Sequence, residues 1–150
     1  MSTGAALHRG DIVIASFPFT DLSNNKRRPA VVLAVNSRSD DVVMAFVSSV
    51  VPTQLEPYDL LLSPSDTDFW GSGLKVSSVV RLNKLATVER RLLTRRIGSL
   101  SVARMRLVDQ KLTQALGIAV EYFYRQEYER LRHILHTKGI EALLTELKDT

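Results

Sequence analysis

The sequence predicts a mainly β domain followed by helices, and three observations support this. From Asp11 to about Val88, short apolar and β-branched runs alternate with turn residues, with no helical stretch between them. After Gly98 the apolar residues recur at spacings of three and four, which is typical of amphipathic helices. The chain has 150 residues, 45% of them hydrophobic, so it can bury one core without disulfides. These features together predict a small barrel carrying an extended helical tail.

Short apolar runs are expected to form the strands of the barrel. The segments between them contain Pro, Gly, Asn, Asp and Ser, the residues that favour turns. The absence of helical segments between the runs favours antiparallel strands over a parallel sheet. The expected strands are Ile12–Phe17, Ala30–Val35, Val42–Val47, Tyr58–Leu62, Ser78–Leu82 and Ala86–Val88.

The helical pattern begins at Ser101, a residue type that caps helix N-termini. Apolar residues keep the helical period as far as Gly139, and Gly117 weakens the helix without having to stop it. One helix of roughly 38 residues would be about 57 Å long, which exceeds the width of a small barrel. The helix therefore bends near Gly117 and folds back over its own barrel, or its second half packs on another body, for which a second subunit is the natural candidate. The segment Ile140–Leu147 is compatible with a further helix.

Composition excludes several classes of protein. No apolar run approaches the roughly 18 residues of a membrane span, and the N-terminus lacks the pattern of a secretory signal. The sequence has no cysteine, which excludes thiolate catalysis and cysteine-bound zinc and is consistent with a cytoplasmic location. The three histidines, His8, His133 and His136, have no nearby acidic partners with the spacing of a zinc site. We therefore expect no metal and no other cofactor.

Positive charge is concentrated in one part of the chain. The formal net charge is only +4, but residues 81–111 contain nine basic and two acidic residues. Such a block indicates a polyanionic partner, and a solvated helix and loop surface is the alternative interpretation. We expect most of this block to lie around the start of the C-terminal helix, where it provides general attraction or solubility.

Arginine and hydroxyl side chains are the candidates for chemistry. Lys26, Arg27 and Arg28 precede Pro29 at a junction between a loop and a strand, where proline fixes the backbone. Three successive cations repel one another unless an anion is bound. Ser48 and Ser49 follow a predicted strand, and Arg81 faces away from its apolar neighbours in another. These residues indicate contact with an anion or a phosphate, without specifying a reaction.

Five segments in order make the sequence recognisable. They are Gly10-Asp11-Ile12-Val13, the turn Phe17-Pro18-Phe19-Thr20-Asp21, Arg28-Pro29 with the apolar strand after it, Val47-Ser48-Ser49, and Ser78-Val79-Val80-Arg81-Leu82. Each segment is weak alone, but the succession resembles the MazF/PemK family of toxin ribonucleases from bacterial type II toxin–antitoxin modules. The resemblance covers roughly Arg9 to Ile118. We therefore expect residues 1–118 to form the family's barrel domain with its helix, and residues 119–150 to be a helical extension of unknown role.

The resemblance implies an SH3-like (CcdB/PemK-type) barrel that acts as a homodimer, with RNA along the subunit interface and a cognate antitoxin as partner. Members of the family cleave single-stranded mRNA at specific sequences without a metal, leaving a 2′,3′-cyclic phosphate and a 5′-hydroxyl. The implied catalytic residues are Arg28, Ser48 and Arg81. If the chain is such a ribonuclease, we expect Lys26, Arg27, Ser49, Ser77 and Asn83 to bind RNA, with base stacking on an aromatic side chain such as Phe19 or Trp70.

Asn83 departs from the PemK-like branch, which has an acidic residue at this position. An aspartate can accept a proton and an asparagine cannot, so catalysis would depend on electrostatics and orientation, or on an arginine as proton donor. Low activity is then one possibility. A barrel that binds nucleic acid or protein without catalysis is a second reading. A third is a gyrase poison, although such toxins end in Trp-Gly-Ile and this chain ends in Leu147-Lys148-Asp149-Thr150.

Overall fold

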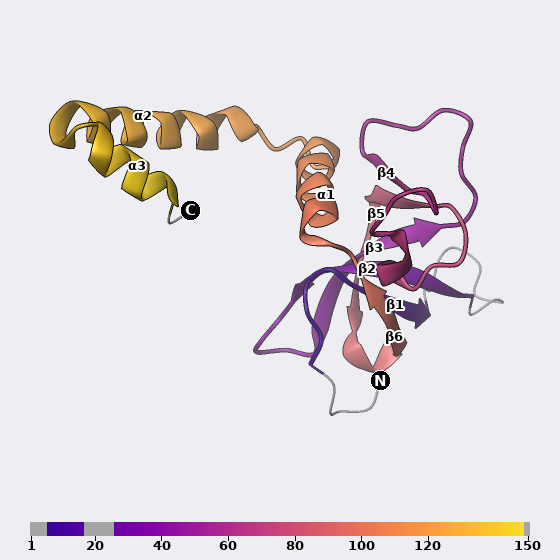
Figure 1. The fold of residues 1–150 in the computed structure, drawn as a ribbon. Coiled ribbons are helices and arrows are strands. Elements are labelled where there is room, and N and C mark those ends of the chain that lie inside the picture. The colour runs from indigo at the N-terminus through magenta and orange to yellow at the C-terminus, as the bar shows by residue number, and fades with distance from the viewer. Residues whose placement is uncertain (1–5, 17–25, 149–150) are drawn as a thin grey trace. The chain divides into compact units, whose positions relative to one another are not determined.

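The computed structural model describes residues 6–16 and 26–148 (Figure 1). Its centre is a six-stranded antiparallel sheet with the strand order β4-β5-β3-β2-β1-β6. This sheet and the helices after it confirm the predicted mainly β class. The strands are β1 (Asp11–Ser16), β2 (Arg27–Val35), β3 (Asp41–Ser48), β4 (Asp59–Leu62), β5 (Ser78–Glu89) and β6 (Leu93–Ser99).

Two differences from the predicted strands concern the later part of the sheet. The runs Ser78–Leu82 and Ala86–Val88 belong to one long strand, β5, and β6 was not predicted at all. In β6 only Leu93 is buried and the next three side chains are exposed, so the strand lacks a clear apolar alternation. Phe17, the last residue of the first predicted strand, lies outside the described residues.

A bulge divides β5 into two parts. Ala45 of β3 pairs with Leu85, whereas the next residue, Phe46, pairs with Arg81, so residues 82–84 have no partner in β3. Extra residues of this kind bend a strand and increase its twist. The first part of β5 thereby pairs with both β4 and the end of β3, while the second part pairs with the beginning of β3.

The sheet separates two clusters of buried side chains, because successive residues of a strand point to opposite faces. One cluster includes Val31 and Val47 and is covered by Val108 of α1 (Val102–Ala115) and Phe69 of the 3-10 helix η1 (Phe69–Ser72). The other gathers alternate residues of the same strands with others around them: Leu7, Val13, Ala15, Ala30, Val32, Val42, Met44, Phe46, Val88 and Leu93.

Helix α1 begins as predicted, at Ser101. The Ser101 hydroxyl accepts a hydrogen bond from the Arg104 amide at 3.1 Å and donates one to Asp68 at 2.5 Å. The bond from Ser101 lowers the pKa of the Asp68 carboxyl, with a further lowering from Arg104 and an opposing effect of burial. These contacts join the start of α1 to the segment that precedes η1.

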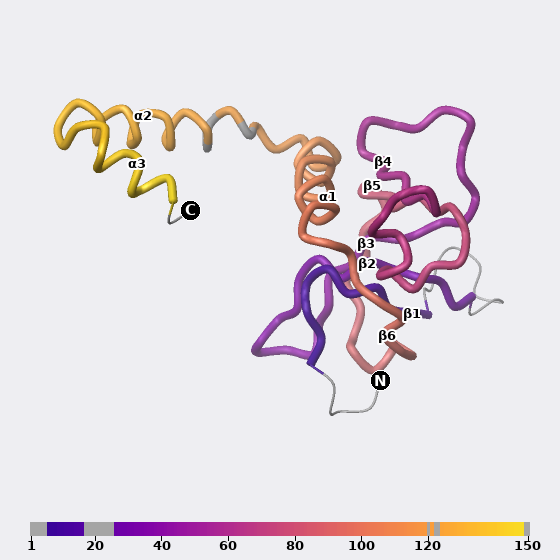
Figure 2. The backbone as a smooth tube through the Cα atoms, viewed as in Figure 1, coloured from indigo at the N-terminus to yellow at the C-terminus, as the bar shows by residue number. Residues whose placement is uncertain are grey.

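The long helical pattern after Ser101 is divided into three helices, which Figure 2 follows along the backbone. Helix α1 stops because Gly117 adopts φ +65°, a left-handed conformation that glycine tolerates. The chain then forms α2 (Val120–Lys138) and α3 (Ile140–Lys148), which are separated at Gly139. The helical pattern is therefore interrupted near Gly117, where a bend was one of the alternatives, and the further helix near the end is present.

The described residues up to Leu116 form one compact unit, the sheet unit, and those from Gly117 form a second, the helical unit. In the helical unit α2 and α3 pack together, and Arg130 of α2 forms ion pairs with Glu127 and with Glu146 of α3. None of the described helices combines the length and apolar character needed to cross a membrane.

Most of the basic block precedes the C-terminal helix and lies on the last two strands and the turn between them, which corrects the expectation that it surrounds the start of that helix. Three of its nine cations belong to α1, and the others lie on β5, on β6 and on the short 3-10 helix η2 (Arg90–Leu92) between them. Within the block, Arg95 and Arg96 are exposed on β6, which is an edge strand of the sheet.

Candidate nucleic-acid interface

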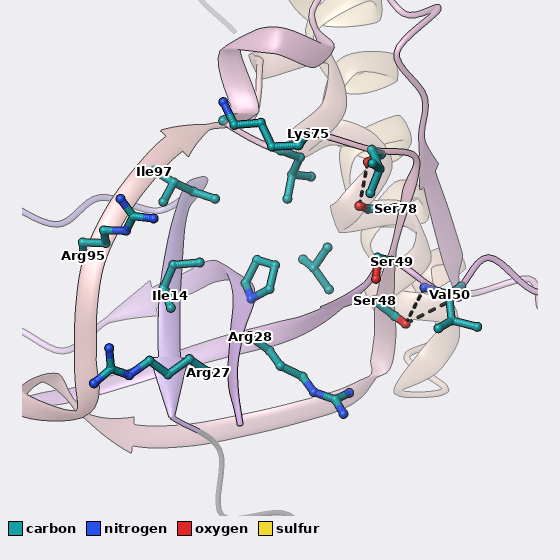
Figure 3. A pocket seen from close by; sticks show the side chains of 15 residues that line it. Ile14, Arg27, Arg28, Ser48, Ser49, Val50, Lys75, Ser78, Arg95 and Ile97 are labelled. Carbon is teal, nitrogen blue, oxygen red and sulfur yellow. Dashed lines mark hydrogen bonds between the residues drawn. The ribbon is translucent and has the colours of Figure 1, made fainter. Parts of the chain in front are cut away.

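A groove of about 530 Å³ opens where the first residues of β2 meet the end of β3 and the segment after η1 (Figure 3). Its floor is apolar, and four cations and three serines stand around it. The residues that line it are Ile14, Arg27, Arg28, Pro29, Val47, Ser48, Ser49, Val50, Gly73, Leu74, Lys75, Val76, Ser78, Arg95 and Ile97. An apolar floor under a cationic rim suits a polyanion whose bases or side chains are partly apolar.

One wall of the groove depends on a close approach between two backbones. Gly73, with φ +74°, follows η1 and lies against β6, where an added Cβ would come within 2.0 Å of the Ile97 carbonyl oxygen. A Cβ on Gly98 of β6 would lie 2.3 Å from the Ser72 carbonyl carbon. The absence of both side chains lets η1 pack on β6 and brings Lys75 to the rim.

The two arginines at the start of β2 are held by the strand itself. Arg27 pairs with Ser16 and Arg28 with Ala15 of β1, and Pro29 follows with its fixed φ. Both arginine side chains are exposed, and Figure 3 shows them on one side of the groove, with Lys75 on the other. The regular pairing confirms that these cations stand at a strand start.

Arg28 is placed over an aromatic ring. Its guanidinium carbon lies 4.9 Å from the centroid of Phe46, which is only 5% exposed. A cation over an aromatic face is attracted by the negative charge of the ring face, and a guanidinium can keep its N–H donors free while it stacks. Arg28 is thus positioned with donors available for a phosphate.

Serine hydroxyls form another part of the rim. Ser48 accepts a hydrogen bond from the Val50 amide at 3.1 Å and donates one to the Val50 carbonyl at 3.4 Å. Ser49 is exposed beside it, whereas Ser78 is buried deeper in the groove and donates to the Val76 carbonyl at 2.9 Å. The bonds of Ser48 fix its hydroxyl at the end of β3, as Figure 3 shows.

Arg81 lies next to this groove without lining it. Phe46 pairs with Ala30 on one side and with Arg81 on the other, so the register places all three side chains on one face of the sheet. Arg28, two residues before Ala30, shares that face. The Phe46 ring thus lies between the strand that carries Arg28 and the strand that carries Arg81.

The structure gathers some of the other predicted residues and separates the rest. Arg27, Arg28, Ser48 and Ser49 meet at the groove. Lys26, Ser77, Asn83 and Trp70 do not line it: Lys26 is exposed before β2, Asn83 is exposed in the β5 bulge, Ser77 precedes β5, and Trp70 is 64% exposed on η1. Phe19 lies outside the described residues.

Sequence reasoning missed three groups at the groove: Lys75, Ser78 and Arg95. Arg95 was within the basic block, but its strand was not predicted. Ser78 was included in a strand, whereas its neighbour Ser77 was chosen as the binding residue. No pattern in the sequence marks Lys75, which comes from an acidic stretch and reaches the rim only through the turn at Gly73.

Metal ligands are not grouped in the part of the chain that the structure describes. Among residues 6–16 and 26–148, no three His, Cys, Asp or Glu side chains lie close enough to hold a metal ion. The described lining of the groove contains neither a carboxylate nor an imidazole. The groups available there for chemistry are guanidinium, ammonium and hydroxyl.

Solved structures with a similar fold include three toxins or endoribonucleases. MazF from Deinococcus radiodurans is 22% identical, with a TM-score of 0.59 over 76% of this chain and 99% of that chain. An endoribonuclease in complex with its cognate antitoxin, from a mycobacterial species, is 21% identical, with a TM-score of 0.58 over 75% and 97%. The Mycobacterium tuberculosis toxin MazF-mt6 is 22% identical, with a TM-score of 0.56 over 71% and 96%. These likenesses confirm the predicted fold.

The sequence itself also matches a family. No curated protein sequence is significantly similar to the chain. Residues 8–116, however, match the model of the PemK-like, MazF-like toxins of type II toxin–antitoxin systems. The match covers well over half of the chain and ends where α1 gives way to the helical unit. The chain therefore belongs to the PemK-like, MazF-like toxin family of type II toxin–antitoxin systems.

Proposed function

We propose that this chain is a toxin that cleaves single-stranded RNA as a metal-independent, sequence-specific endoribonuclease. The observation that carries the proposal is the cationic groove, in which Arg28 stands over Phe46 beside the fixed hydroxyl of Ser48. Membership in a toxin family and the endoribonucleases of the same fold support this choice. The site of action is the cytoplasm, where mRNA is the substrate.

The reaction is an internal transesterification of the RNA backbone. The ribose 2′-oxygen forms a bond to phosphorus and the bond from phosphorus to the 5′-oxygen breaks, leaving a 2′,3′-cyclic phosphate and a 5′-hydroxyl. The proton lost from the 2′-hydroxyl is balanced by the proton gained at the 5′-oxygen. No water, metal or oxidant is consumed, so the site has to orient the reacting atoms and stabilise the charge.

The catalytic residues we propose are Arg28, Ser48 and Arg81. The two arginines carry permanent charge and several donors, so they stabilise the negative phosphorane and clamp its oxygens. Ser48 donates to a phosphate oxygen when it exchanges its weak 3.4 Å bond to Val50 for the substrate. The RNA-binding residues we propose beside them are Lys26, Arg27, Ser49, Ser77 and Asn83.

The partners follow from the same groove. We propose that the toxin acts as a homodimer and that an acidic, flexible segment of a cognate antitoxin covers the cations around the groove. The antitoxin-bound endoribonuclease of the same fold supports this. We further propose that residues 1–118 carry the activity and that residues 119–150 are an extension.

A barrel that binds RNA without cutting it is the second candidate. The observation in its favour is Asn83, an exposed amide where the PemK-like branch has an acid, together with the lack of a base among the described residues of the groove. Salt-dependent RNA binding with no scission would support this candidate.

The test is cleavage of a varied pool of single-stranded RNA in EDTA by the wild type, Arg28→Ala and Arg38→Ala. Arg38 is a matched control, since it is an exposed arginine between β2 and β3 that does not line the groove. We expect Arg28→Ala to lose about 10²–10³-fold in rate and Arg38→Ala to keep it. If none of the three proteins cuts any RNA in the pool, the enzymatic proposal is wrong.

A further inference from the structure

A buried carboxylate stands behind Arg81. Asp59 of β4 and Arg81 of β5 are register partners, and Oδ1 of Asp59 lies 2.9 Å from Nε of Arg81. The Asp59 side chain has no exposed surface, whereas 24% of the Arg81 side chain is exposed. The pair therefore reaches from the interior, at the carboxylate, to the surface, at the guanidinium.

The carboxylate of Asp59 is also fixed by the turn that precedes its strand. Its Oδ2 accepts a hydrogen bond from the Glu56 amide at 3.0 Å, and its backbone amide donates to the Glu56 carbonyl, also at 3.0 Å. The turn before β4 is tied to α1, because Nζ of Lys111 donates to the Pro57 carbonyl at 3.1 Å. Asp59 is thus a rigid anchor for the arginine that it faces.

Arg81 stands on the face of the sheet that carries Phe46 and Arg28. Asp59 pairs with Arg81 and Arg81 pairs with Phe46, so the anchor, the cation and the aromatic ring lie side by side across β4, β5 and β3. The acid that the PemK-like branch has two residues after the arginine is absent, since Asn83 lies exposed in the bulge. Asp59 brings a carboxylate to Arg81 from a different strand.

We propose that Asp59 is a positioning residue of the ribonuclease site, which holds Arg81 beside Phe46. This inference rests on the proposed function. Nε of Arg81 and Oδ1 of Asp59 are close enough for an ion pair but are not aligned as a hydrogen bond, so charge attraction holds the guanidinium on its Nε side and leaves the terminal N–H donors for the substrate. An arginine held at Nε presents its terminal nitrogens in a fixed plane, which is the geometry that a phosphate needs.

Asp59 acts through Arg81 and not on the substrate. A carboxylate with no exposed surface cannot reach a ribose 2′-hydroxyl, and both of its oxygens already face donors. Its removal should therefore change the rate of the chemical step, which depends on the orientation of Arg81, more than it changes the affinity for RNA.

The experiment is a double-mutant cycle on RNA cleavage in EDTA. Asp59→Asn is made in the wild type and in Arg81→Ala, and rates are taken per folded protein at a temperature where circular dichroism shows the folded state. We expect Arg81→Ala to lower kcat about 100-fold. Asp59→Asn should lower it about 10- to 100-fold in the wild type and have no further effect in Arg81→Ala. Affinity for an uncleavable 2′-deoxy analogue should change less than about threefold.

Asp11→Asn is the matched control, because Asp11 is also buried and its Oδ1 lies 2.8 Å from Nε of Arg96. Asp11 is the first residue of β1, whereas Ala15, the partner of Arg28, lies near the other end of that strand. The loss of the Asp11 carboxylate should therefore lower the melting temperature and leave kcat unchanged. If Asp59→Asn does not fold, Asp59→Glu is used, which keeps the charge and displaces the carboxylate by one methylene. The same non-additivity with Arg81→Ala is then expected.

The outcomes separate the two proposals. A wild type that cuts RNA while the Asp59 variants keep its rate overturns the role of Asp59 alone. The role is also wrong if Asp59 substitution lowers kcat by the same factor with and without Arg81. A wild type that cuts no RNA overturns the proposed function, and the role of Asp59 falls with it.

Discussion

The guanidinium of Arg28, on the first residues of β2, stacks on the ring of Phe46 in the adjacent strand β3, 4.9 Å from its centroid. Phe46 is buried, so the ring that supports the cation belongs to the core of the sheet. The core thereby fixes the position of a surface charge. Replacement of the ring should therefore change the position of Arg28 in the groove and the activity that depends on it.

Phe46→Leu tests this support. Leucine keeps an apolar side chain in the core but removes the aromatic face, whose attraction for a cation is about 0.5–2 kcal/mol. We expect RNA cleavage per folded protein to fall about 3- to 10-fold, with Arg28 less well held. Val32→Ala, in the same buried cluster, is the control: it should lower stability by about 1–3 kcal/mol and leave the rate unchanged. Equal rates for both variants would contradict the role of the ring.

The cationic rim should determine how strongly RNA binding depends on salt. Arg95 lines the groove from an exposed position on β6, so we expect Arg95→Ala to weaken binding and to lower the slope of log affinity against log salt by about 0.7. The measurement is fluorescence anisotropy with a single-stranded, uncleavable oligonucleotide. Arg91→Ala on η2 is the control, because that arginine is exposed and does not line the groove, and its slope should equal that of the wild type.

The wall between η1 and β6 should not tolerate a side chain. An added Cβ at Gly98 would overlap the backbone of Ser72, so Gly98→Ala should destabilise the protein by more than about 2 kcal/mol, in the range of overpacked sites. Gly71→Ala is the matched control on η1, because the nearest atom to its added Cβ is 3.9 Å away. The measurement is the melting temperature of the two variants in thermal unfolding. A melting temperature for Gly98→Ala equal to that of Gly71→Ala would show that the wall can shift.

The helical unit should be dispensable for the fold of the sheet unit. The family match ends at residue 116, and Val108 of α1 already belongs to the core of the sheet unit. A chain of residues 1–118 should therefore unfold cooperatively within a few degrees of the full-length protein and retain RNA cleavage. Loss of the cooperative transition in this shorter chain would mean that the sheet unit depends on residues 119–150.

The strands that are continuous apolar runs in the sequence are the ones that could be predicted from it. Val42–Val47 and Ala30–Val35 lie inside the observed β3 and β2, because their buried residues produce a strong apolar signal. Strand β6 was not predicted, because its arginines are exposed and Leu93 is its single buried residue, which leaves no apolar pattern in the sequence. The helical period continues across Gly117, so the end of α1 depends on a backbone angle that periodicity does not reveal.

The residues of the candidate site also fall into two groups, those that local sequence can identify and those that depend on the pairing of strands. Arg28 and Ser48 stand at a strand start and a strand end, and local sequence is enough to identify such positions. Asp59 and Phe46 act through pairing between strands, and that pairing depends on the register and on the bulge of β5. Local sequence contains neither, so the support behind both arginines became visible only in the fold.

The central claim is that the groove cleaves RNA through the ribose 2′-hydroxyl, using arginine and hydroxyl groups and no metal. Its most direct test takes one oligonucleotide with a mapped cleavage position, as all-RNA and with a single 2′-deoxy sugar immediately 5′ of the scissile phosphate. Both are incubated with the protein in EDTA, and the products are weighed by mass spectrometry. We predict that the RNA gives a 2′,3′-cyclic phosphate and a 5′-hydroxyl and that the modified strand stays intact at that position. Cleavage of the modified strand there, or RNA products with a 3′-hydroxyl, would contradict the account.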